Sequence, residues 1–85
     1  MTVNKVLIKL YVPVIEEEYD VWIPLNKRVY NVTNLLVKVL QEFSFGEYNP
    51  TRMPKLYNRI TGVKYESDQI IEDTSIRNGT EIILI

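Results

Sequence analysis

The fold of this chain can be inferred from residues 72–85, which read EDTSIRNGTEIILI. Asn78 and Gly79 form a strong turn signal, because both residue types tolerate positive φ angles. The segment TEIILI that follows is almost entirely apolar, which is typical of a strand at the centre of a sheet. We therefore expect residues 80–85 to form a central strand whose neighbours come from earlier in the chain.

Two segments near the N-terminus alternate in polarity with the period of a β-strand. In VNKVLIKLYV, residues 3–12, the even-numbered side chains from Val6 onward are apolar. In YDVWIPL, residues 19–25, the odd-numbered side chains are apolar. Pro24 favours an edge position for this second strand, since proline cannot donate to a ladder. The polar connection predicts a hairpin with the glutamates of residues 16–18 at its tip.

The pattern then changes to the period of an α-helix. In NVTNLLVKVLQEF the apolar residues recur at offsets of three and four, which places them on one stripe. The sequence predicts a helix over about residues 31–43, with Asn31 as its N-cap. Gly46 is expected in a left-handed turn just beyond its end.

Residues 44–54 are predicted to form a loop, and short strands are expected at residues 55–58 and at Lys64 and Tyr65. A helix that follows a hairpin must cover the hairpin's apolar face. A right-handed crossover then returns the last strand beside the first one and parallel to it. This order predicts an α+β fold of the β-grasp type, a single domain over residues 1–85. Its mixed four- to five-stranded sheet is expected to pack on one helix.

The segment IIEDTSIRNGTEIILI resembles the C-terminal third of ubiquitin-like proteins, and YDVWIPLNKRVYNVTNLL resembles their second strand and helix entry. Within this superfamily, the length, the helix register and the I-x-N-G-x-x-I ending are most similar to the YukD/EsaB group. The resemblance implies that Ile71, Ile76, Ile82 and Leu84 take the family's core positions. It also implies an association with type VII (WXG100) secretion in Gram-positive bacteria.

Conjugated ubiquitin-like proteins and sulfur carriers end in a flexible Gly-Gly tail, because a mobile terminus without side chains must enter a narrow adenylating site. This chain has three glycines, and none of them follows Gly79. We therefore expect a protein that is not conjugated through its terminal carboxylate.

The composition excludes several kinds of chemistry. The chain has no cysteine and no histidine, which excludes a disulfide framework, a thiolate zinc site and a histidine general base. Its formal net charge of -1 provides no basic surplus for nucleic acid. The acidic run at residues 16–18 lacks the ligand spacing of a calcium loop. We expect no catalytic residue, no metal and no cofactor.

The N-terminal segment MTVNKVLIKLYVPV carries Lys5 and Lys9 inside its apolar run. It therefore fits neither a signal-peptide core nor a membrane span. The lack of cysteine is compatible with the cytosol, and we expect a cytoplasmic protein without direct membrane insertion.

The helix leaves one face of the predicted sheet uncovered, and several apolar side chains lie on it. Contiguous apolar surface often marks an interface, and Trp and Tyr are frequent interface anchors. The sequence leaves open the alternative that these side chains only pack across strands. The predicted partner-binding residues on this face are Leu7, Lys9, Tyr11, Trp22, Tyr57, Ile83 and Ile85.

Two functions remain in view. The first is a non-conjugating interaction module that docks its sheet face onto a protein of a type VII secretion apparatus, with weak self-association through the same face as a variant. The alternative is a non-catalytic auxiliary subunit of a multicomponent bacterial monooxygenase, a setting in which small ubiquitin-like chains also occur.

Overall fold

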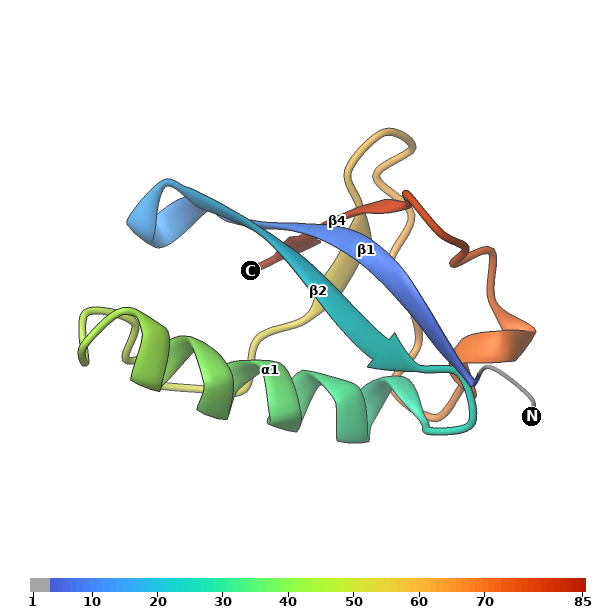
Figure 1. Ribbon diagram of the computed structural model, residues 1–85, viewed down its shortest axis with the longest axis horizontal. Coiled ribbons are helices and arrows are strands. Elements are labelled where there is room, and N and C mark those ends of the chain that lie inside the picture. Colours follow the sequence, from blue (N-terminus) through green and yellow to red (C-terminus); the bar gives the residue numbers. More distant parts are fainter. Residues whose placement is uncertain (1–3) are drawn as a thin grey trace.

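The elements are β1 (Lys5–Val12), η1 (Pro13–Ile15), β2 (Glu17–Pro24), α1 (Val29–Phe43), β3 (Leu56–Asn58), η2 (Ile71–Asp73) and β4 (Glu81–Leu84). Helix α1 lies across one face of a sheet whose strand order is β2-β1-β4-β3 (Figure 1). The structure is a computed structural model that describes residues 4–85, so Val3 of the predicted N-terminal segment lies outside the described residues. β1 pairs antiparallel with β2 and parallel with β4, and β3 pairs antiparallel with β4.

The last strand occupies the predicted central position, and the predicted β-grasp arrangement is confirmed, with four strands in a mixed sheet. The further strand expected at Lys64 and Tyr65 is wrong, because Lys64 forms only an isolated bridge with Tyr57. The Asn58 side chain accepts hydrogen bonds from the amides at positions 60 and 61, both at 2.9 Å. These bonds turn the chain back tightly after β3, so the returning segment pairs at a single position.

The core lies between α1 and the inner face of the sheet. In β1 the even-numbered side chains from Val6 to Val12 are buried, while the odd-numbered ones are exposed or half-buried. The four side chains that the family resemblance places in the core are all nearly inaccessible, at 1% exposure or less. They are Ile71, Ile76, Ile82 and Leu84.

Helix α1 starts two residues earlier than the sequence predicts, and Asn31 is not its N-cap. The helix begins at Val29 without a side-chain capping bond. The Val29 amide donates instead to the Gln69 carbonyl at 2.8 Å. The next amide, of Tyr30, donates to the Ser67 carbonyl at 2.9 Å. A distant loop thus satisfies the first free amides of the helix, and Asn31 lies inside the first turn.

The hairpin tip is formed by η1 and Glu16 rather than by all three glutamates. The Glu16 amide donates to the Pro13 carbonyl at 3.0 Å, and Glu16 itself has a left-handed φ of 54°. Glu17 and Glu18 already belong to β2. The left-handed turn predicted after the helix is also present: α1 ends at Phe43, and Gly46 has a φ of 84°.

The predicted Asn78-Gly79 turn holds β1 and β4 in register. The Asn78 side-chain oxygen accepts a hydrogen bond from the Leu7 amide at 2.8 Å. The Gly79 amide donates to the Leu7 carbonyl, also at 2.8 Å. The two backbone groups of Leu7 that face β4 are therefore satisfied by the turn before β4 begins, which extends the parallel ladder by one step.

We expect Asn78→Ala to lower the free energy of unfolding by about 1 kcal/mol, because it leaves the Leu7 amide without its acceptor. Asn78→Asp keeps an acceptor oxygen and is the matched control, for which we expect a smaller loss. Urea denaturation of the three proteins measures the difference. Equal losses for Ala and Asp would show that the side-chain oxygen does not hold this register.

Candidate partner-binding surface

The outer face of the sheet, which α1 does not cover, carries its side chains in three rows that cross the strands. The first is the Trp22 row, formed by Trp22 of β2 and Leu7 of β1, which lie opposite one another in the register. Trp22 is 57% exposed, whereas Leu7 is half-buried. A tryptophan with this much accessible surface presents a large rigid apolar area at low conformational cost, which suits contact with another molecule.

The tyrosine row lies toward the opposite end of the sheet and consists of Tyr11, Ile83 and Tyr57. Ile83 is the register partner of Tyr11 in β1 and of Tyr57 in β3. All three side chains are half-buried, since each is flanked by the others across the strands. The row is apolar in its centre and carries phenolic hydroxyls at its two ends.

A charged row separates these two apolar rows. Lys9 of β1 lies opposite Asp20 of β2 and beside Glu81 of β4. Glu81 in turn accepts a backbone hydrogen bond from the Arg59 amide at 2.9 Å, which places Arg59 at the end of the same row. The signs alternate across the sheet in the order Asp20, Lys9, Glu81, Arg59. Opposite charges in adjacent strands are the favourable cross-strand arrangement.

Arg59 extends from this row over the centre of the face. Its guanidinium carbon lies 4.4 Å from the centre of the Tyr11 ring, a cation–π contact. It also donates a hydrogen bond to Glu18 and lies 4.0 Å from the Glu81 carboxylate. The hydrogen bond to Glu18, together with the negative charges of Glu18 and Glu81, raises the pKa of Arg59. The Arg59 guanidinium therefore covers part of the Tyr11 ring. The pairing of β4 with both β1 and β3 brings these two residues together.

The structure thus brings the predicted residues to one face but not into one continuous apolar patch. Leu7 and Trp22 form one patch, Tyr11, Ile83 and Tyr57 form another, and Lys9 lies between them. Sequence reasoning missed Arg59 and Glu81, which complete the dividing row. The parity of Glu81 relative to Ile83 was a usable signal for its outward orientation. Arg59 follows the short strand β3 and had no such signal.

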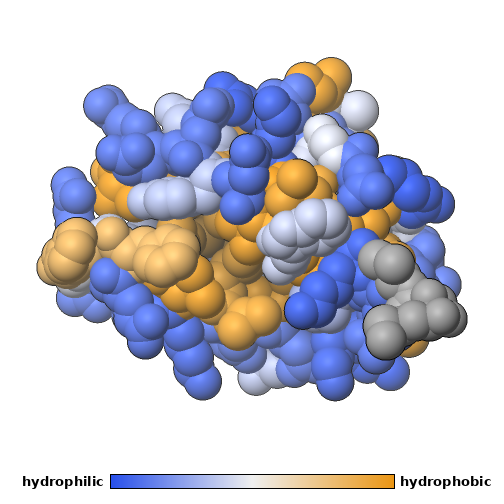
Figure 2. Space-filling model, in the orientation of Figure 1, coloured by the Kyte–Doolittle hydropathy of each residue, from blue (hydrophilic) through white to orange (hydrophobic). Residues whose placement is uncertain are grey.

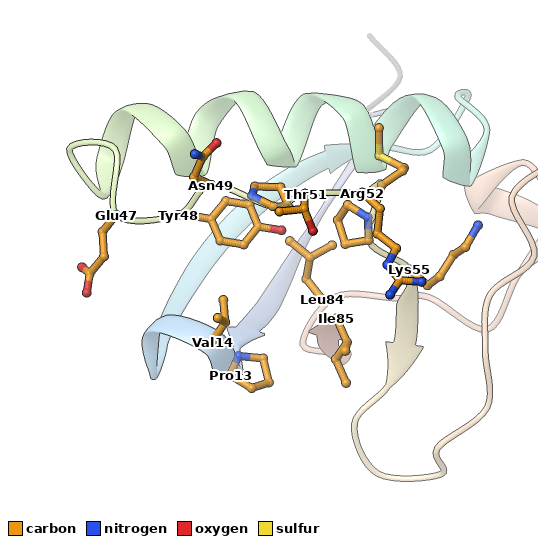
Figure 3. A pocket seen from close by; sticks show the side chains of 13 residues that line it. Pro13, Val14, Glu47, Tyr48, Asn49, Thr51, Arg52, Lys55, Leu84 and Ile85 are labelled. Atoms are coloured by element: carbon orange, nitrogen blue, oxygen red, sulfur yellow. The ribbon is translucent and has the colours of Figure 1, made fainter.

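Ile85, the remaining predicted residue, lies at the margin of the outer face. Its amide and carbonyl exchange hydrogen bonds with Lys55 at 3.0 and 2.8 Å, so it continues the pairing of β4 with β3. Its side chain is 65% exposed and lines a groove of about 590 Å³. Figure 3 shows Tyr48 and Val14 facing one another across this groove, with Leu84 and Ile85 to one side of them.

Tyr48 forms the enclosed wall of this groove. The side chain is only 3% exposed, and burial raises the pKa of its phenol above the ordinary value. Its backbone amide donates to the Ser44 hydroxyl at 2.8 Å, which ties the loop to the end of α1. The groove is therefore bounded by a fixed aromatic side chain on the loop side and by the exposed Val14 on the hairpin side.

Within residues 4–85, no helix combines the length and the apolar character that crossing a membrane requires. The same part of the chain holds no cluster of three or more acidic side chains placed to share a metal ion.

No protein-family model matches the chain, and no curated protein is significantly similar to it in sequence. Solved structures are similar in fold. A chain of the MycP5-free ESX-5 inner membrane complex has a TM-score of 0.77 and 17% identity, over 98% of this chain and 21% of that one. This chain therefore spans about a fifth of the ESX-5 chain it matches.

Two further structures match along nearly the whole of both chains. The ubiquitin-like domain of the Mycobacterium tuberculosis type VII secretion system protein EccD1 has a TM-score of 0.76 and 12% identity, over 98% of this chain and 99% of that one. A chain of the toluene 4 monooxygenase HD complex with 4-bromobenzoate has a TM-score of 0.75 and 12% identity, over 94% and 95%. These likenesses show that the chain has a ubiquitin-like fold.

We expect a favourable coupling between Arg59 and Tyr11 in a double-mutant cycle built from Arg59→Gln and Tyr11→Leu, because the guanidinium stacks on the ring. A second cycle, which pairs Arg59→Gln with Trp22→Leu, is the control, since Trp22 lies in the other apolar row. Denaturation of the single and double variants measures both couplings. Equal couplings in the two cycles would contradict the contact over Tyr11.

Because the pKa of Tyr48 is raised, the free energy of unfolding depends on pH in the alkaline range. Below the ordinary tyrosine pKa of about 10, both the folded and the unfolded states keep the proton. Above it, the unfolded state releases the proton first, so the folded state loses stability as the pH rises through the folded pKa. We expect the wild type to lose stability relative to Tyr48→Phe above about pH 10 and not below it. A constant difference across denaturation curves at pH 8 to 11 would contradict this expectation.

Proposed function

We propose that this chain is a non-catalytic interaction module of a type VII secretion apparatus, and that it docks the outer face of its sheet onto a protein partner. The observation that carries the proposal is the exposed Trp22 on a sheet face that the helix does not cover. The fold similarity to a chain of the ESX-5 inner membrane complex and to the ubiquitin-like domain of EccD1 supports the choice of apparatus.

Docking on this face would bury both apolar rows and enclose the charged row between them. Trp22 and Leu7 are the anchor on one side, and Ile83 with Tyr57 is the anchor on the other. Lys9 lies between them and meets the partner's polar groups, so it fixes orientation more than it adds affinity. Such an arrangement, with apolar anchors around charges that must be matched, selects a partner by both shape and charge.

The proposal places the chain closest to the YukD/EsaB type of ubiquitin-like protein, in the bacterial cytoplasm, acting without a cofactor and without covalent conjugation. The I-x-N-G-x-x-I segment supports this placement, because Ile76 and Ile82 are both buried and the turn between them fixes the register of the central strand. Self-association through the same face is a second way of burying Trp22.

A second candidate function is that of an auxiliary, non-catalytic subunit in a multicomponent monooxygenase. The fold similarity to a chain of the toluene 4 monooxygenase complex favours it. The two candidates share the docking chemistry and differ in the partner, so recovery of an oxygenase subunit with the native protein distinguishes this function from the first.

We expect Trp22→Ala and Ile83→Asp to keep the fold and to reduce partner recovery by about tenfold, because interface anchors commonly contribute 1–2 kcal/mol or more. Tyr30→Ala is the matched control, since Tyr30 is an exposed aromatic side chain on α1. Pull-downs with mass spectrometry measure recovery of secretion-apparatus proteins, and circular dichroism checks the fold. Unchanged recovery with both outer-face variants would refute the assignment of this face.

A further inference from the structure

β2 is an edge strand, and part of its backbone is available for pairing. The Leu25 amide donates to the Asn4 carbonyl at 2.6 Å, which identifies that position as a hydrogen-bonded pair of the antiparallel ladder. Hydrogen-bonded pairs alternate along such a ladder, so the backbone groups of Glu18, Asp20 and Trp22 point away from β1. No hydrogen bond within residues 4–85 involves these groups. The edge therefore offers three donor–acceptor positions, and Pro24, which has no amide, closes the row.

An apolar groove of about 260 Å³ runs between this edge and helix α1. Tyr19 and Val21 of β2 form one wall, and Val39 and Phe43 of α1 form the other. Figure 2 shows hydrophobic side chains gathered in a band across this face of the molecule. Phe43 is 63% exposed, and its ring centre lies 6.4 Å from that of Tyr19, which closes one end of the groove.

The charge around the groove is strongly one-sided. β2 carries Glu17, Glu18 and Asp20 and no basic side chain. Helix α1 adds Glu42 and a single base, Lys38. These two elements therefore hold four acidic side chains and one basic side chain, although the whole chain has a net charge of only -1. Glu18 is matched by Arg59. Asp20 faces Lys9 across the ladder but forms no salt bridge among the described residues.

We propose that the β2 edge and its groove bind an extended peptide segment of a partner in which apolar and basic residues alternate. Added as a fifth strand, the segment directs every second side chain to the inner side of the sheet, into the groove. The other side chains continue the outer face of the sheet beside Asp20, which has no salt bridge, so lysine or arginine is complementary there. The geometry thus favours a peptide whose sequence repeats every two residues, with one apolar and one basic side chain in each repeat.

The same charges disfavour a second copy of this chain as the occupant. An antiparallel pair of β2 edges centred on Asp20 places the two Asp20 side chains directly opposite one another, and like charges in that position are destabilising. Acidic side chains on an edge strand are a usual protection against self-pairing. The edge is therefore suited to a partner of opposite charge. This surface is distinct from the outer-face docking proposed above, with Asp20 and Trp22 at the boundary between them.

The test uses the full chain and synthetic peptides. The probe is a short peptide in which valine alternates with lysine. A peptide in which glutamate replaces lysine tests the charge, and one with the same composition in blocks tests the alternation. A third peptide, N-methylated at alternate amides along the edge that faces β2, tests backbone pairing. Isothermal titration calorimetry measures the dissociation constants, and amide NMR shifts locate the site.

We expect the valine–lysine probe to bind at least about threefold more tightly than the glutamate peptide, because lysine is attracted to Asp20 and glutamate is repelled by it. The largest amide shifts are expected at Glu18, Asp20 and Trp22, and N-methylation should abolish binding. Phe43→Ser and Asp20→Asn should each weaken binding, whereas Ile60→Ser, an exposed apolar residue that does not line this groove, should not. Circular dichroism establishes that each variant is folded.

Several results would overturn the proposal. Equal binding of the N-methylated probe would exclude strand addition, and equal binding of the glutamate peptide would exclude the charge rule. No measurable binding of the valine–lysine probe would exclude the site. A concentration-dependent dimer in sedimentation that protects the amides of β2 would identify a second copy as the occupant. None of these results affects the test of the outer-face proposal with Ile83→Asp. Ile83 lies on β4, away from the β2 edge, so that variant tests the outer face alone.

Discussion

The parallel pairing of β4 with β1 is the contact on which the rest of the structure depends. It places Ile82 and Leu84 in the core, and within residues 4–85 β4 is the one strand of the sheet that pairs with β3. A parallel pair cannot be joined by a tight turn, so the chain between β1 and β4 has to cross over, and α1 lies in that connection. The buried stripe of the helix and the uncovered outer face are two consequences of the same geometry.

Much of this arrangement could be predicted from the sequence, because it rests on local periodicity. The alternation in β1, the helical stripe and the Asn78-Gly79 turn each specify their own structure, and together they leave one topology. The start of α1 could not be predicted in this way. Asn31 is a good local cap, but the carbonyls of Ser67 and Gln69 satisfy the first amides. Contacts between distant segments override local preference where both are available.

On the candidate surface, too, the features set by local periodicity could be predicted and those set by contacts between distant segments could not. Alternation correctly placed the aromatic and aliphatic side chains on the outer face, since the period of a strand fixes that face. Glu81 and Arg59, which complete the charged row, escaped prediction because the row is assembled from distant segments. Arg59 follows β3 and reaches Glu18 across 41 positions of sequence. A row of alternating charges between two apolar patches prevents the exposed face from forming one contiguous apolar surface. It also gives any partner a charge pattern to match.

The hydrogen bond between the Leu7 amide and the Asn78 side chain joins residues separated by 71 positions. During synthesis, the hairpin and α1 emerge from the ribosome long before this contact can form. Until residues 78–84 are available, the backbone groups of β1 that pair with β4 therefore stay hydrated. During that time the apolar face of β1 is covered by the helix alone. A chain whose central strand arrives last is slow to complete its sheet relative to one built from local pairs.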